Sequence, residues 1–281
     1  MFCTPIPNLL YKPPPCRIPA RPRRCAPMPP EKAEALIIRL ADFSESSRVV
    51  TFFTREFGKS SALAKGAKRL KGPFEGAIDL LAQVQIILYR KDHDALDLVT
   101  ESQLICRFHP TSKQMFPLYA AYYVAELLDI GTEPHDPHPQ LFDLAIETLA
   151  QLQAASDPRF AILRFELLLL REIGHLPGFT HCSGCDAPAT WDGEAKPSFD
   201  TRYWVTQSGL LCEACGRLDY AHAAIQPGSV RLLQQLSGET TPDLAALAPT
   251  ASQLKEVRRI VTAAVCHALD RKPKMLGYLK F

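Results

Sequence analysis

The stretch ALIIRLADFSESSRVVTFFT, residues 35–54, contains two runs rich in Ile, Val and Phe on either side of the polar turn Asp42–Ser47. Such runs, bounded by a polar turn, predict two paired β-strands at Ala35–Leu40 and Val49–Thr54. Three more candidate strands follow, Ser60–Ala64, Ala82–Tyr89 and Leu96–Ser102. Five short strands within residues 33–110 match a small barrel, and the OB-fold is the leading five-stranded type.

A basic loop follows the third candidate strand. Between Gly58 and Gly72 the chain carries five positive charges and no acid. Cations on a loop suit the phosphates of a nucleic acid, and glycines let the backbone approach a ligand closely. A merely solvated charged face is the alternative interpretation, and the glycine spacing excludes a Walker loop. The candidate DNA contacts here are Lys59, Lys65, Lys68, Arg69 and Lys71. Aromatic residues on which a base can stack are Phe43, Phe52, Phe53 and Phe57, although strand alternation places most of them in the core.

Helical periodicity begins near Ser112 and returns after the cysteine-containing segment. Apolar residues recur there every three to four positions, which is the pattern of amphipathic helices. We expect these helices to form one helical domain, residues 111–178 plus 226–281, interrupted by residues 179–225. The fold class is therefore multidomain α+β, with an OB-fold barrel first. The predicted helices cover residues 112–129, 141–152, 158–173, 227–236 and 254–269.

Cations also gather in the last helical stretch of the chain. Lysine and arginine near the end of a helix complement its dipole, which is one sufficient explanation of them. The other explanation is a basic rim around an apolar groove that receives an acidic peptide tail. The candidate partner-binding residues are Lys255, Arg258, Arg259, Arg271, Lys272 and Lys274.

Two CxxC pairs, Cys182–Cys185 and Cys212–Cys215, are separated by 26 residues. Two residues between the cysteines of a pair let both thiolates face one ion, and a second pair completes a tetrahedron around Zn²⁺. We therefore predict one structural zinc ion in a zinc-ribbon-like insertion at residues 179–225. A redox dithiol pair or an iron–sulfur site is the alternative. A redox CxxC pair usually lies near a βαβ pattern, and the sequence around these cysteines does not have one. Four thiolates also leave no open position for catalytic zinc.

The composition is that of an ordinary globular protein, with 47% hydrophobic and 22% charged residues in 281. No apolar run approaches the roughly 20 residues that cross a bilayer, so no membrane partner is expected. Nine cysteines, of which four form the two CxxC pairs, indicate metal binding in a reducing compartment rather than a disulfide scaffold. Cys106 and Cys266 lie in apolar sequence and are expected to be buried.

Residues 1–32 form a Pro/Arg-rich extension. Its first thirty residues hold ten prolines, five basic residues and no acid, a composition that predicts disorder. Two interpretations fit, a basic tail that binds nucleic acid or a start codon assigned too early, with Met28 as the true initiator. The proline density and the lack of an apolar core argue against a transit or secretory peptide.

No catalytic set can be assembled from the sequence. Glu101, His109 and Glu166 are scattered, with no nucleophile beside a base. We therefore expect a protein without enzymatic activity.

From Glu34 to near the C-terminus the chain resembles the RecO family of recombination-mediator and DNA repair proteins. The resemblance rests on residues 35–39, 43–59, 64–69 and 164–185, in that order and spacing. It implies an OB-fold, a helical domain and, as in many members, a zinc finger. The DNA contacts that it implies are the loop cations named above, with Arg39 and Arg48 in addition.

The implied activity is non-enzymatic and belongs to the bacterial cytoplasm, in association with the nucleoid. Members of the family bind single- and double-stranded DNA, anneal complementary strands and help load RecA onto strands coated by single-strand-binding protein. The implied partners are RecR, possibly RecF, and the acidic C-terminal tail of single-strand-binding protein. The alternative function is a zinc-stabilised adaptor that binds acidic tails and does not anneal DNA.

Overall fold

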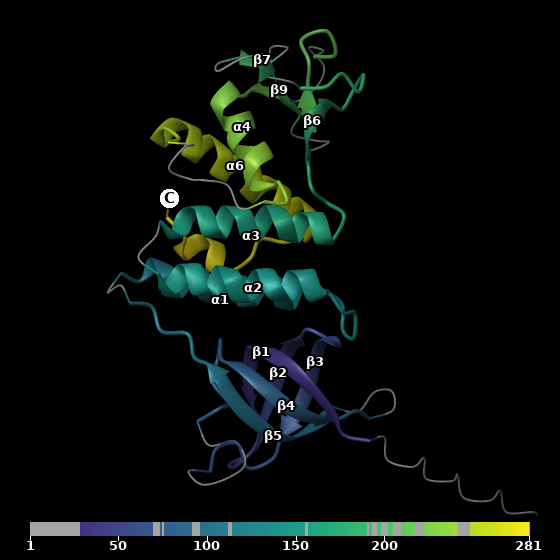
Figure 1. Ribbon diagram of the computed structural model, residues 1–281, viewed down its shortest axis with the longest axis vertical. Coiled ribbons are helices and arrows are strands. Elements are labelled where there is room, and N and C mark those ends of the chain that lie inside the picture. The colour runs from purple at the N-terminus through teal and green to yellow at the C-terminus, as the bar shows by residue number, and fades with distance from the viewer. Residues whose placement is uncertain are drawn as a thin grey trace, which may run out of the picture.

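The molecule divides into a β-barrel, a stack of helices and a group of short strands at the far end (Figure 1). Among the residues that the structure describes, no helix is both long and apolar enough to cross a membrane. The described residues of this computed structural model are 29–69, 74, 76–91, 96–111, 114–154, 157–189, 191–192, 196–197, 202–204, 209–216, 222–240 and 248–280.

Five strands close into a barrel in the order β1-β2-β3-β5-β4. β3 and β5 pair in parallel, and the other neighbours are antiparallel. This closed five-stranded barrel confirms the OB-fold that the sequence predicts. The strands are β1 (Glu31–Asp42), β2 (Arg48–Thr54), β3 (Gly58–Ala64), β4 (Gln83–Tyr89) and β5 (Asp97–Cys106).

Alternating burial explains why β3 and β4 form strands, because every second residue of each faces the barrel interior. β2 is buried on both faces: Phe52 packs inside the barrel, whereas Phe53 packs against the helices. Two strand boundaries differ most from the sequence prediction. β1 already begins at Glu31, within the predicted extension, and β5 runs on to Cys106. Residues 1–28 lie outside the described part of the chain.

Helices form where the sequence predicts them, and their starts are locally encoded. Proline is the first residue of α2, α3 and α4, where its missing N–H leaves no helical hydrogen bond unmade. Thr250 and Gln253 form a reciprocal capping box at the start of α6. The helices are α1 (Phe116–Gly131), α2 (Pro139–Gln153), α3 (Pro158–Glu172), α4 (Pro227–Leu236) and α6 (Ala251–Ala268), followed by the 3₁₀ turn η1 (Met275–Tyr278).

The barrel and the helices share an interface at α1 and α2, the helical layer nearest the barrel (Figure 1). The Phe53 and Phe142 rings stack with centroids 6.4 Å apart. Arg55 donates two hydrogen bonds, of 2.9 and 3.0 Å, to the Asp143 carboxylate. Gly58, at a φ of +68°, has no room for a side chain, since a Cβ would lie 1.9 Å from the Asp136 carbonyl oxygen. These contacts fix how the barrel sits against the helices.

A buried charged group joins three helices. Glu166 of α3 is fully buried, and it accepts hydrogen bonds of 2.6 Å from the Tyr123 hydroxyl of α1 and from Arg258 of α6. Burial raises the pKa of Glu166 above its ordinary value, against the opposing effect of Arg258. Burial and the nearby Glu166 charge together raise the pKa of Tyr123 well above its usual range.

Short strands carry the cysteine segment between α3 and α4, at the end of the molecule farthest from the barrel (Figure 1). Four of them form a sheet in the order β11-β9-β10-β6, and β7 pairs with β8. The helical domain is thus interrupted in the chain but continuous in space, because α3 packs on both α4 and α6. The strands are β6 (Gly178–Cys182), β7 (Trp191–Asp192), β8 (Lys196–Pro197), β9 (Arg202–Trp204), β10 (Gly209–Leu211) and β11 (His222–Ala224).

The expectation for the two isolated cysteines is wrong in one case. Cys106 ends β5 and is exposed, next to the exposed Leu104 and Ile105. Cys266 on α6 is partly buried. The apolar neighbours of Cys106 misled the prediction, because this end of β5 turns its side chains to solvent rather than to the core.

Candidate functional sites: the four-cysteine centre and the cationic barrel face

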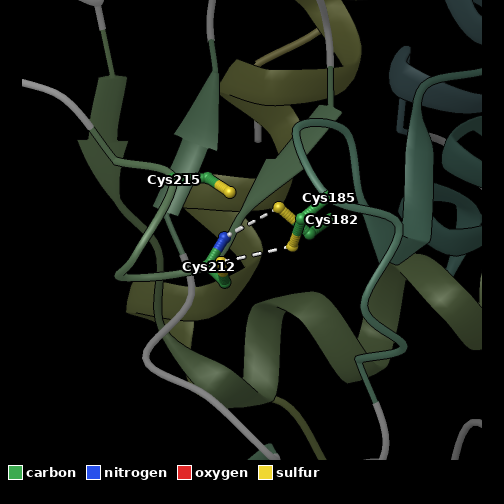
Figure 2. A group of neighbouring side chains, drawn as sticks. All are labelled: Cys182, Cys185, Cys212 and Cys215. Atoms are coloured by element: carbon green, nitrogen blue, oxygen red, sulfur yellow. Dashed lines mark hydrogen bonds between the residues drawn. The ribbon is translucent and has the colours of Figure 1, made fainter.

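The two CxxC pairs meet. Cys182 ends β6 and Cys185 follows it, Cys212 and Cys215 follow β10, and the four thiols point toward a common centre (Figure 2). Their four sulfur atoms all lie within 4.8 Å of one another. β6 and β10 pair in parallel, so both loops leave the sheet in the same direction. The sequence spacing correctly predicts this cluster.

The loop around Cys182 is shaped to bring the thiols together. The backbone N–H groups of Gly184 and Cys212 point at the Cys182 sulfur, at 3.4 and 3.2 Å. Gly184 lets the two pairs approach closely, since a Cβ there would lie 3.0 Å from the Cβ of Cys215 and 3.1 Å from its sulfur. Asp186 takes a left-handed backbone with a φ of +59° to close the turn.

The thiols perturb one another strongly. Burial alone would raise the pKa of Cys182, but the N–H donors around its sulfur lower it to about 6. Hydrogen bonds with the Cys185 and Cys212 thiols raise the pKa of Cys215 to about 12. Four sulfurs this close therefore resist joint ionisation unless a cation neutralises them.

The donor set fits one tetrahedral metal ion. A tetrahedron with Zn–S bonds of about 2.3 Å has S–S edges of about 3.8 Å. The sulfurs of Cys185 and Cys212 are 3.7 Å apart. Four closely spaced thiols are therefore able to hold a thiophilic ion with a closed coordination shell.

The second site lies at one end of the barrel, where the turn after β1 meets the loop after β3. We call it the cationic face and define it by Arg48, Lys65, Lys68 and Arg69. The Lys68 N–H donates to the carbonyl of Ser46 at 3.1 Å, which joins loop and turn. Lys65 and Arg69 are exposed, and among the described residues neither has a carboxylate within salt-bridge distance.

Asp42 supplies the negative charge of this face. Its carboxylate lies 2.9 Å from Lys68 Nζ and 3.3 Å from Arg48 Nε. The hydrogen bond from Lys68, opposed in part by desolvation, lowers the pKa of Asp42. The sequence expectation of a loop without a competing carboxylate is therefore wrong for Lys68, because the acid comes from the preceding turn.

Two predicted DNA contacts lie elsewhere. The ammonium group of Lys59 hydrogen-bonds the Asp129 carbonyl oxygen, and its side chain is only 13% exposed at the junction with α1. Arg39 is exposed and lies 3.8 Å from the Asp129 carboxylate, at the same junction. Lys71 lies outside the described residues. The structure therefore brings together four of the seven predicted cations and assigns Lys59 a contact between domains.

One of the four aromatic candidates is available to stack on a base. Phe52 and Phe53 are fully buried and Phe57 is partly buried, as strand alternation predicts. Phe43 is 61% exposed in the turn next to the cationic face, and its N–H is held by the Ser47 carbonyl at 3.1 Å. An exposed aromatic ring beside cations is the arrangement that single-stranded nucleic acids use.

The C-terminal cations divide into two groups. Arg258 is buried and bound to Glu166, so it does not belong to a surface rim. Nearby, the Glu126 carboxylate accepts the backbone N–H groups of Lys274 and Met275 at 2.7 and 2.8 Å, which ties the C-terminal segment to α1. The exposed cations are Lys255, Arg259, Arg271, Lys272 and Lys274.

The candidate catalytic residues do not meet. Glu166 is enclosed in its buried pair, whereas Glu101 and His109 are exposed on and after β5. The geometry of these three residues offers no nucleophile–base pair.

Comparison with known proteins identifies the family. A model described as the recombination protein O N terminal matches residues 28–108, and one described as the recombination protein O C terminal matches residues 113–276. The chain belongs to the RecO family. The first match covers the barrel, and the second covers the helices together with the cysteine segment, so the RecO architecture accounts for both candidate sites.

Named RecO proteins align with most of the chain. The DNA repair protein RecO of Rhodopirellula baltica is 39% identical over 181 residues, which span 64% of this chain and 65% of that protein. The RecO protein of a Roseiflexus species is 28% identical over 248 residues, 88% of this chain and 84% of its own. The Bacillus subtilis RecO protein is 29% identical over 203 residues, 72% of this chain and 75% of its own. The chain is thus a member of a family of bacterial DNA repair proteins.

Proposed function

We propose that this protein is a recombination mediator that binds single- and double-stranded DNA, anneals complementary strands and helps load RecA onto strands coated by single-strand-binding protein. The observation that carries the proposal is the cationic face, with the exposed Lys65, Arg69 and Phe43 at one end of an OB-fold barrel. Cations neutralise phosphates without reading the sequence, and an aromatic ring accepts any base. This suits a protein that must act on strands of any sequence.

RecR, possibly RecF, and the acidic tail of single-strand-binding protein are the proposed protein partners, in the bacterial cytoplasm. For the tail, the supporting observation is the group of exposed cations around η1, next to the exposed Tyr278. The Tyr278 ring packs at a tilt against the Tyr119 ring, with 5.3 Å between ring centroids. An acidic peptide with apolar residues at its end would find both charges and apolar surface there. The same observation supports the second candidate function, an adaptor that binds acidic tails without annealing DNA.

Annealing of complementary strands precoated with single-strand-binding protein tests the proposal. We expect the protein to accelerate annealing well above the spontaneous rate, and to do so less when the acidic tail has been removed. Annealing that is absent on both coated and bare strands, together with binding of the tail alone, would favour the adaptor. Loss of both binding reactions would contradict both functions.

For the four-cysteine centre we propose one structural Zn²⁺ ion held by Cys182, Cys185, Cys212 and Cys215. Its support is the closed donor set and the 3.7 Å sulfur spacing. The centre lies at the end of the molecule opposite the barrel that carries the cationic face (Figure 1). We therefore propose that the ion stabilises the segment between α3 and α4 and does not read DNA.

Replacement of Cys212 by serine is expected to abolish stoichiometric zinc and to lower the free energy of unfolding by about 2 kcal/mol, because metal binding and folding are coupled. For a chain of this size that corresponds to a fall of about 5 °C in Tm. DNA affinity per folded molecule should not change. Metal analysis, thermal unfolding and DNA titration check this, with Cys106→Ser as the control that keeps its zinc. A loss of affinity at unchanged stability would place the zinc centre in the DNA site instead.

A further inference from the structure

The cationic face contains a built-in anion. Asp42 is the last residue of β1, it pairs across the strands with Arg48, and its two carboxylate oxygens face Lys68 Nζ at 2.9 Å and Arg48 Nε at 3.3 Å. Lys68 Nζ also donates to the Ser44 carbonyl at 3.0 Å. A cation from β2 and a cation from the loop after β3 thus converge on one small anionic group. Convergence of an arginine and a lysine on one anion is also how proteins hold a phosphate.

The ion pairs of Asp42 with Arg48 and Lys68 contribute little to the stability of the fold. The Asp42 side chain is 68% exposed, and the side chains of Arg48 and Lys68 are 34% and 24% exposed. Exposed ion pairs add little to stability, because water competes for both charges and the side chains lose conformational freedom. The turn and the loop are already joined here by the backbone hydrogen bond from Lys68 to Ser46. Fold stability therefore does not explain this carboxylate.

We propose that the Asp42 carboxylate occupies the position between Arg48 and Lys68 that a DNA phosphate takes, so that a strand must displace it to bind there. The inference rests on the proposed function and adds a device that sets its strength. Lys65 and Arg69 engage phosphates without competition, whereas Arg48 and Lys68 exchange one anion for another. A phosphate that contacts an already neutralised cation contributes less binding free energy, because it must first displace the carboxylate. Asp42 therefore lowers the affinity for a strand and favours its release.

The consequence is measurable in the salt dependence of binding. Each phosphate neutralised by a protein cation steepens the slope of log K against log salt by about 0.7 for single strands. Removal of the Asp42 charge leaves Arg48 and Lys68 free to neutralise the one phosphate between them, and therefore adds about one such contact. Asparagine keeps the shape and the hydrogen-bonding oxygen of aspartate, so the turn is preserved.

The experiment compares single-strand binding by the full-length protein, Asp42→Asn and Glu45→Gln across a ten-fold range of salt. Glu45 lies in the same turn, is exposed, and among the described residues makes no ion pair, so its substitution removes a charge without releasing a cation. We expect Asp42→Asn to bind more tightly at low salt, with a slope steeper by about 0.7, so that its advantage over the wild-type protein grows by about 5-fold for each ten-fold fall in salt. Glu45→Gln should keep the wild-type slope.

Adding Lys68→Gln to Asp42→Asn should remove part of this gain, and should cost more there than in the wild-type chain. Equal effects of Asp42→Asn and Glu45→Gln would show a general charge effect and overturn the proposal. Weaker binding by Asp42→Asn would overturn it as well, because Asp42 would then be organising the site. Failure of the proposed function is distinct from both outcomes, since the wild-type protein itself would then not bind the strand.

Discussion

Replacement of Glu166 by alanine is expected to lower the free energy of unfolding by about 3–5 kcal/mol, the largest effect that we expect of a single substitution on stability. The substitution removes the acceptor, at 2.6 Å, of both the Arg258 guanidinium and the Tyr123 hydroxyl. Arg258 is buried. Removal of the carboxylate that pairs with a buried charge costs far more free energy than the ion pair itself contributed to stability. Chemical denaturation monitored by circular dichroism measures the change.

Glu147→Ala is the matched control for this substitution. Glu147 is an exposed glutamate on α2, and it accepts a hydrogen bond of 2.9 Å from Gln151 on the same helix. Its replacement should alter the free energy of unfolding by no more than about 0.5 kcal/mol. If the two substitutions cost the same, the buried triad of Tyr123, Glu166 and Arg258 does not hold α1, α3 and α6 together.

Much of the fold could be predicted because it is encoded locally. The pattern of apolar residues shows which face of an element is buried. In strands it is the alternation in residues 58–64 and 83–89, and in helices it is the three-to-four spacing. The ends of β1 and β5 could not be predicted this way. Glu31 and Lys32 pair with β4 despite their polarity, and Leu104 and Ile105 are apolar and yet exposed. Pairing with β4, which is distant in sequence, determines where β1 begins and where β5 ends.

The two candidate sites differ in the same respect. The cysteines could be predicted to meet because their spacing within each pair sets the local geometry, and two such pairs share one ion. The cations could not be sorted by sequence. Lys59 contacts Asp129, 70 residues later, and Glu166 binds Arg258, 92 residues later. A run of positive charge shows that cations are close in sequence, but not which of them a carboxylate has already engaged.

Simultaneous reversal of Lys65 and Arg69 to glutamate is expected to weaken single-strand binding by roughly 10- to 100-fold at moderate salt, since two phosphate contacts become two repulsions. These two residues are the exposed cations of the face that lack a carboxylate partner among the described residues. Because both are surface residues of a loop, the folded fraction should not change, which thermal unfolding verifies. The slope of affinity against salt should become shallower by about 1.4.

The central claim is that strands bind the cationic face of the barrel and not the basic C-terminal segment. The direct test is a titration of labelled single-stranded DNA with the wild-type protein, Lys65→Glu with Arg69→Glu, and Lys255→Glu with Arg259→Glu. The last variant reverses two exposed charges on α6 and is therefore matched in charge. We predict a large loss of affinity in the barrel variant and little in the α6 variant. A greater loss in the α6 variant, with barrel-variant binding intact, would contradict the account.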